Sequence, residues 1–182
     1  YYLTDAEAEI FRDQHDVIAD AFGTKTLQLI ELGAGDGSKS QILLSHMLDQ
    51  AFAFEYIPID ISQAAIDELA GSLRANLPAL KTSGICDDYF RGLARVPDRG
   101  SKPLVVMFLG STIGNFDPAG RRQFFSRLTK ELKSGDQLLM GFDLKKDPKI
   151  LQAAYDDPEG VTSEFNYNLL RRMNRELDAD FD

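Results

Sequence analysis

The segment from Leu27 to Ser40, LQLIELGAGDGSKS, constrains the fold of this chain more than any other. It opens with a short apolar run, which is typical of a strand buried on both faces of a parallel sheet. Three glycines at alternate positions follow, Gly33, Gly35 and Gly37, and then a helical stripe with Ser38 as its predicted N-cap. Because glycine tolerates positive φ and leaves the backbone bare, this order predicts a bend whose N–H groups face a ligand.

The spacing of the glycines and the nearby charges indicate the kind of ligand. A dinucleotide-binding loop has the pattern G-x-G-x-x-G, whereas Ser38 stands here at the position of its last glycine. Glu31 and Asp36 flank the bend, and carboxylates disfavour a diphosphate. We therefore expect a cofactor without phosphate, and S-adenosylmethionine fits through its sulfonium, ammonium and ribose. An NAD(P)-dependent Rossmann oxidoreductase is the alternative.

A carboxylate follows the bend at an informative distance. The segment FEYIPIDI, residues 54–61, predicts a second strand that ends at Asp60, with Ser62 capping the next helix. An acid about 20 residues beyond a glycine bend, at the end of the second strand, can accept both ribose hydroxyls of a nucleoside. The bend and Asp60 together predict nucleoside binding more specifically than either feature alone.

Two later loops are expected at the same edge of the sheet. Asp87 and Asp88 follow a weak strand and can accept the exocyclic amine of adenine, with Tyr89 or Phe90 against the base. Asn115 follows a buried strand and offers both a donor and an acceptor. The carboxyl ends of parallel strands meet at one edge, so these loops should lie near the bend. Taken alone, the acidic pair is an ordinary loop and Asn115 is a turn residue.

The order of the predicted elements indicates an α/β fold with a doubly wound, mostly parallel sheet, formed by residues 1–182 as a single domain. An N-terminal helix is expected over 1–23, entered through a capping box from Thr4 to Glu7. A stripe from Val161 to Leu177 is expected to pack in the core. The expected strands are 27–32, 54–61, 81–85, 103–109 and 137–144.

Composition excludes several classes of function. A net charge of −9 argues against binding to nucleic acid or anionic lipid, and no apolar run or leader indicates a membrane span or a signal peptide. The single cysteine, Cys86, excludes an internal disulfide and favours the cytoplasm. His15 and His46 fall on separate helices, and no His/Cys/Asp group has metal-ligand spacing, so no metal is expected.

Several segments together carry a family resemblance that covers nearly the whole chain. The chain resembles the histidine-specific Nα-methyltransferases of ergothioneine biosynthesis, which depend on S-adenosylmethionine. The resemblance implies a Rossmann-like methyltransferase fold and methyl transfer to the α-amine of an amino acid, most directly L-histidine. A noncatalytic domain that binds S-adenosylmethionine is the alternative. The matching segments are YYLTDAEAEI, LIELGAGDGSKS, YIPIDIS, FLGSTIGNF, GDQLLMGFDLKKD and AYDDPEGVTSEFNYNLLRRMNRELDADF.

The resemblance also implies roles for single residues. The bend with its Gly33, Gly35 and Lys39, together with Asp60, would contact the cofactor. In that family a C-terminal part completes the sheet and carries an acid that reads the substrate imidazole, and this chain stops at Asp182, before that part. The remaining implied residues are Asp88 and Tyr89 for the adenine side, and Tyr2, Asn115 and Tyr155 for the amino acid, with Tyr1 in place of Tyr2 if the register shifts by one.

Overall fold

The computed structural model describes residues 2–182, except the side chains of Tyr2 and Tyr155. The chain divides into two compact units, Leu3–Asp143 and Leu144–Asp182. The helices of the larger unit are α1 (Tyr2–Ala21), α2 (Ser40–Asp49), α3 (Gln63–Asn76), α4 (Tyr89–Ala94), the 3₁₀ helix η1 (Thr112–Asn115) and α5 (Pro118–Glu131). Its strands are β1 (Thr26–Leu32), β2 (Ala53–Asp60), β3 (Lys81–Thr82), β4 (Ile85–Cys86), β5 (Leu104–Phe108) and β6 (Gln137–Met140).

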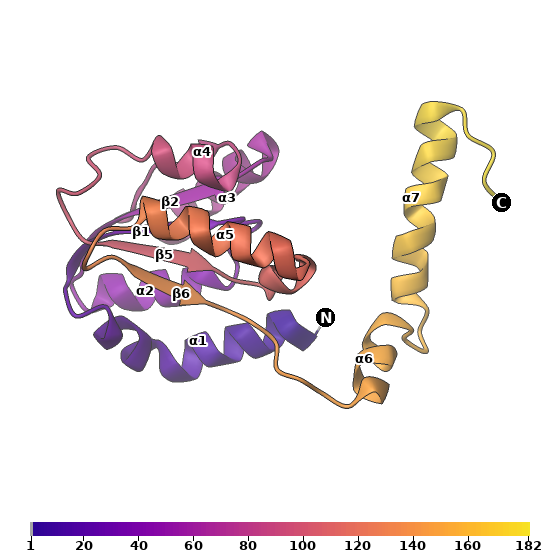
Figure 1. Ribbon diagram of the computed structural model, residues 1–182, viewed down its shortest axis with the longest axis horizontal. Helices are drawn as coiled ribbons and strands as arrows, with labels where there is room; N and C mark the ends of the chain where they lie inside the picture. The colour runs from indigo at the N-terminus through magenta and orange to yellow at the C-terminus, as the bar shows by residue number, and fades with distance from the viewer. Residues whose placement is uncertain (1) are drawn as a thin grey trace. The chain divides into compact units, whose positions relative to one another are not determined.

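The larger unit is built on one parallel sheet with β1 at its centre. The strand order is β3-β2-β1-β5-β6, and β4 pairs with β2 beyond β3. The helices α1 and α2 lie on one side of the sheet and α5 lies on the other (Figure 1). The predicted α/β fold with a doubly wound, mostly parallel sheet is confirmed.

Alternate residues of the strands face two separate cores. Leu27 and Leu29 of β1 pack with buried residues of α1, α2 and α3. Ile30 and Leu32 face the opposite way and pack with buried residues of α4 and α5. Because β1 is covered on both faces, all of its residues after Thr26 are buried, including the polar Gln28 and Glu31, as expected for a central parallel strand.

Two predicted strands differ from the observed ones. The expected strand over 81–85 is broken into β3 and β4, and α3 packs against the break, where a Cβ on Gly84 would lie 2.5 Å from Ile66 Cγ2. The last strand ends at Met140 rather than at Leu144. Met140 pairs with Phe108, which is the final residue of β5, so the pairing between these two strands stops there.

Two of the predicted helix starts are also wrong. α1 already begins at Tyr2, so the expected capping box from Thr4 to Glu7 lies inside the helix. α2 begins at Ser40 without a side-chain cap, because the Ser38 hydroxyl instead donates to Asp36 at 2.9 Å. The predicted cap of α3 is confirmed, since Ser62 accepts from the backbone of that helix.

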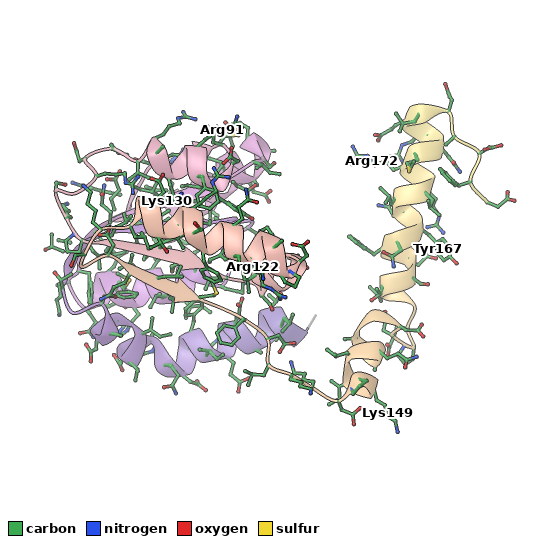
Figure 2. The ribbon with its side chains drawn as sticks, in the orientation of Figure 1. Arg91, Arg122, Lys130, Lys149, Tyr167 and Arg172 are labelled. Atoms are coloured by element: carbon green, nitrogen blue, oxygen red, sulfur yellow. The ribbon has the colours of Figure 1, made fainter. Side chains whose placement is uncertain are left out.

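The smaller unit contains α6 (Pro148–Tyr155) and α7 (Val161–Leu177). The expectation that the apolar stripe of α7 forms core is wrong within the described chain, since Phe165 is 76% and Leu169 is 61% exposed. The labelled side chains of Tyr167 and Arg172 project from this helix (Figure 2). Among the described residues, no helix is long and apolar enough to cross a membrane.

Candidate functional site

The bend after β1 has the backbone geometry that its glycines predict. Gly33, Gly35 and Gly37 have φ angles of 73°, 54° and 63°, which other residues adopt only with strain. The N–H of Gly33 donates to the carbonyl of Ile59 at 2.7 Å, which ties the bend to β2. A Cβ on Gly37 would lie 2.3 Å from Leu69 Cδ1, so α3 packs tightly there, whereas no atom of the described residues lies within 4 Å of a Cβ on Gly35. The bend is therefore anchored at both ends and open at Gly35.

Asp60, at the end of β2, lies against this opening. Its Oδ2 accepts from the N–H of Gly35 at 3.3 Å, and its Oδ1 accepts from the N–H of Ser62 at 3.0 Å. Each carboxylate oxygen can accept further hydrogen bonds, so Asp60 can both hold the bend and bind hydroxyl groups. The expected juxtaposition of glycine bend and acid is present.

Tyr89, the first residue of α4, closes the other side of the bend. Its hydroxyl lies 3.2 Å from the position of a Cβ on Gly33, so a side chain there would crowd the ring. The ring packs edge-on against Phe108, with centroids 5.5 Å apart. Burial, and then the negative charge of Asp60, raise the pKa of the half-buried Tyr89. Tyr89 is therefore a neutral aromatic group beside the opening.

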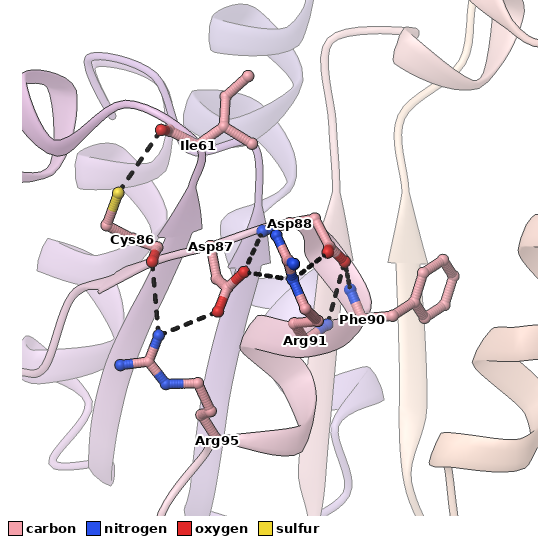
Figure 3. Close-up of polar contacts among 7 residues, drawn as sticks. All are labelled: Ile61, Cys86, Asp87, Asp88, Phe90, Arg91 and Arg95. Carbon is pink, nitrogen blue, oxygen red and sulfur yellow. Dashed lines mark hydrogen bonds and ion pairs between the residues drawn. The ribbon is translucent and has the colours of Figure 1, made fainter.

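The acidic pair before α4 is held by hydrogen bonds and arginines (Figure 3). Asp88 Oδ1 accepts from the N–H groups of Phe90 and Arg91 and so caps α4, while its Oδ2 lies 2.6 Å from Arg91 Nε. Asp87 is paired with both Arg91 and Arg95. The backbone N–H of Arg91 is the main cause of the lowered pKa of Asp88, and Arg95 is the main cause for Asp87. Asp88 is 44% exposed against 17% for Asp87, so Asp88 is the more accessible of the two.

A pocket of about 330 Å³ lies between the start of α4 and α5. The Arg127 guanidinium sits over the Phe90 ring in its wall, 3.9 Å from the centroid. Aromatic walls with a few polar groups suit a flat heteroaromatic ligand. Its lining residues are Asp88, Tyr89, Phe90, Phe116, Gly120, Gln123, Phe124 and Arg127.

The predicted amino-acid residues are described only in part. Asn115 is the exposed last residue of η1, which follows the carboxyl end of β5, so it lies at the expected edge of the sheet. Tyr2 and Tyr155 are helical, but their side chains lie outside the described residues, and so does the whole of Tyr1. The roles given to these residues stay predictions.

Lys39 takes part in an ion pair that the sequence did not reveal. Its ammonium pairs with the carboxylate of Glu7, and both side chains are largely buried, at 19% and 15% exposure. Glu7 Oε1 also accepts from the N–H of Gly110 at 2.8 Å. The pair thus ties α1 to the ends of β1 and β5. Sequence reasoning missed it because Glu7 was assigned to a capping box.

Glu31 forms a second buried polar group, whose partners the sequence does not reveal. Its side chain is almost fully buried and accepts from the hydroxyls of Ser40 at 2.6 Å and Tyr56 at 2.5 Å. Burial raises the pKa of Glu31 to about 7, although both hydroxyls act in the opposite direction. Glu31 flanks the bend in the sequence, as expected, but its carboxylate is buried in the core, where it joins α2 to the sheet. The sequence signal that could have indicated this buried role is an acidic residue within a strand that is expected to be buried on both faces.

Comparison with known proteins identifies the family. The whole chain, residues 1–182, matches the family described as histidine-specific methyltransferase, SAM-dependent. The chain belongs to this family. The oxidoreductase alternative is therefore not supported, and the predicted dependence on S-adenosylmethionine agrees with the family's description.

Two mycobacterial relatives are similar along the entire chain. It is 42% identical over 182 residues to the histidine N-alpha-methyltransferase of Mycolicibacterium smegmatis and 41% identical over 182 residues to that of Mycobacterium tuberculosis. These matches cover 100% of this chain and 56% of each relative, so the chain spans about half the length of the curated relatives it matches.

A solved structure supports the fold. A protein of Methanococcus maripaludis, assigned as an S-adenosyl-L-methionine-dependent methyltransferase, aligns with a TM-score of 0.52 at 22% identity. The alignment covers 94% of this chain and 76% of that protein. This likeness supports the fold of the chain.

Proposed function

We propose that this chain carries the cofactor-binding part of an enzyme that transfers methyl groups from S-adenosylmethionine to the α-amine of an amino acid, most directly L-histidine. The observation that carries the proposal is the meeting of the bend over 33–37, Asp60 and Tyr89 at one point of the sheet edge. Family membership and the names of the mycobacterial relatives supply the reaction and the acceptor. The free thiol of Cys86 fits a reducing cytoplasm, the compartment we infer.

The charges at the bend favour a cofactor without phosphate. Lys39, the cation nearest to the glycines in sequence, is already paired with Glu7. Asp60 brings a negative charge to Gly35, where a phosphate would be repelled and the ammonium or ribose of S-adenosylmethionine would be accepted. Tyr89 and the pocket beyond it supply an aromatic surface for the adenine, with the exposed oxygen of Asp88 near its exocyclic amine. The described residues thus fit the family's cofactor.

The main contribution of this chain to the reaction is to hold the cofactor and the amino acid in position. When bound, S-adenosylmethionine supplies an electrophilic methyl group on its sulfonium. Asp60 would hold the ribose, and Asn115 would orient the amino acid so that its neutral amine lies close to the methyl group. A water or the Tyr2 hydroxyl takes the proton that the amine loses. Exclusion of water from this edge of the sheet would add to the effect of holding the amine close to the methyl group.

Calorimetric titration of S-adenosylhomocysteine tests the cofactor site. In the Asp60→Ala variant we expect the affinity to fall by about tenfold or more, since two hydrogen bonds from ribose to a charged acceptor are lost. Glu68→Gln, an exposed substitution on α3, is the matched control and should bind like wild type. Circular dichroism checks that the Asp60→Ala variant is still folded. Equal affinities for wild type and Asp60→Ala would remove Asp60 from the ribose site.

A transfer assay separates the enzyme from the noncatalytic alternative. Because the relatives are about twice as long, the full-length gene product is the sample, with radiolabelled methyl donor and L-histidine as acceptor. We expect label in the α-amino group of histidine. Binding of S-adenosylhomocysteine without transfer to histidine or any other amino acid would favour a binding domain instead.

A further inference from the structure

Three side chains that commonly bind metals meet between α1 and α2. His15 and Asp16 come from α1, and His46 comes from α2. One ligand atom from each residue can be chosen so that all three lie within 4.8 Å of one another. The two imidazole rings lie 3.9 Å apart at their centroids, with planes 21° apart. Sequence spacing pointed to no metal site because the two helices bring together residues that are distant along the chain.

The distances between these atoms match those of a coordination sphere. Asp16 Oδ1 lies 3.1 Å from His46 Nε2 and 3.7 Å from His15 Nδ1. Two ligands bound at about 2.1 Å to a tetrahedral ion are separated by about 3.4 Å, which falls between these values. Because the two rings are stacked and nearly parallel, one imidazole must rotate out of the stack before both lone pairs can point at one ion. Asp16 is 71% exposed, so its carboxylate can follow that rotation.

An unsatisfied nitrogen points to a missing partner at the same place. His15 Nδ1 is shielded from solvent and has no hydrogen-bond partner among the described residues, although Asp16 lies at ion-pair distance. A buried polar atom without a partner costs free energy and is uncommon in native proteins. A bound cation would satisfy this nitrogen as well as the carboxylate beside it.

We propose that His15, Asp16 and His46 bind one divalent transition-metal ion of the zinc class. Two imidazoles and one carboxylate favour such an ion over Mg²⁺ or Ca²⁺, which prefer oxygen ligands alone. The exposed Asp16 leaves the remaining coordination positions to water. The ion fastens α1 to α2, and α1 also carries the Glu7 carboxylate that binds Lys39 and Gly110 at the sheet edge. Its role is structural and separate from methyl transfer.

Direct metal titration tests this site. The full chain, freed of any histidine tag and treated with EDTA, is titrated with ZnCl₂ in a calorimeter, and CoCl₂ is used for the absorption bands that report coordination. We expect one ion per chain, an affinity that falls by about tenfold or more in His15→Gln and Asp16→Asn, and no binding of Mg²⁺. Asp13→Asn, an exposed change on the same helix, is the matched control and should bind like wild type.

Thermal unfolding gives a second readout. Zn²⁺ should raise the melting temperature of wild type and Asp13→Asn by clearly more than that of His15→Gln, because stabilisation depends on how tightly the folded site binds the ion. His46 is 13% exposed, so its replacement can disturb packing, whereas His15 at 32% is the safer position for the decisive variant. Equal zinc affinity in wild type and His15→Gln, or no zinc binding at micromolar concentration, would overturn the proposal and leave a stacked histidine pair without a metal.

Discussion

The two faces of the central sheet bury different chemistry, although the same strands form both. On the face covered by α1, α2 and α3, the core includes the hydrogen-bonded group of Glu31, Tyr56 and Ser40. On the face covered by α4 and α5, Phe108 and Phe124 stack with centroids 4.7 Å apart. We call the face covered by α1, α2 and α3 the polar face, because its buried hydrogen bonds hold α2 and the start of the bend in place. We call the face covered by α4 and α5 the aromatic face, because its rings form the wall of the candidate adenine pocket.

The largest expected effect concerns the aromatic face. Phe124 is 3% exposed and touches the rings of Phe108, Phe116 and Tyr89, so Phe124→Ala should lower the free energy of unfolding by about 3–5 kcal/mol. Urea denaturation followed by circular dichroism measures it. The neighbouring Phe125, at 39% exposure, is the control, and Phe125→Ala should cost clearly less. Similar losses for the two variants would mean that the rings do not form a packed core.

The next effect concerns the polar face and depends on pH. The pKa of Glu31 is raised from 4.5 to about 7, so the folded state takes up a proton that the unfolded state does not hold between these values. The contribution of Glu31 to stability is therefore largest below pH 4.5 and declines by about 3 kcal/mol as the pH rises to 7 and above. Glu31→Gln should lose this dependence. Urea unfolding of both proteins from pH 4.5 to 8 measures it, and parallel pH profiles would contradict the assignment.

Features that depend on local sequence could be predicted, whereas features that depend on partners far along the chain could not. Apolar runs and glycines report local backbone preference, so the strand before Gly33, the bend and Asp60 were predicted correctly. The positions of Glu31 and Lys39 depend on partners far along the chain, Tyr56 and Glu7, which no local pattern specifies. The same reason explains why the histidine cluster between α1 and α2 was missed.

Capping and strand ends failed for a related reason. Ser38 is a good N-cap by type, yet its hydroxyl bonds to Asp36 inside the bend, and the helix starts later. The strand over 137–144 has enough apolar residues to continue, but β5, the strand that it pairs with, ends at Phe108. In both cases a tertiary partner decided where the element begins or ends.

A smaller effect is expected where α1 meets the sheet edge. Lys39→Met leaves the buried carboxylate of Glu7 without its cation but keeps its hydrogen bond from Gly110, so we expect a loss of about 1–2 kcal/mol. Urea unfolding at neutral pH measures it. Lys102→Met, an exposed substitution in a loop, is the matched control. If the loss is no greater than in the control, the ion pair does not hold α1 in place.

The smallest expected effect separates two roles of one carboxylate at the edge of the aromatic face. Asp88 caps α4 through Oδ1, while Oδ2 is available to a ligand beside Arg91. Asparagine is as good an N-cap as aspartate, so Asp88→Asn should unfold at the same urea concentration as wild type, whereas Asp88→Ala should unfold earlier. If Oδ2 accepts the adenine amine, both variants should bind S-adenosylhomocysteine about three- to tenfold more weakly in calorimetry. Wild-type affinity in Asp88→Asn would restrict this residue to capping the helix and leave base recognition to the rings around it.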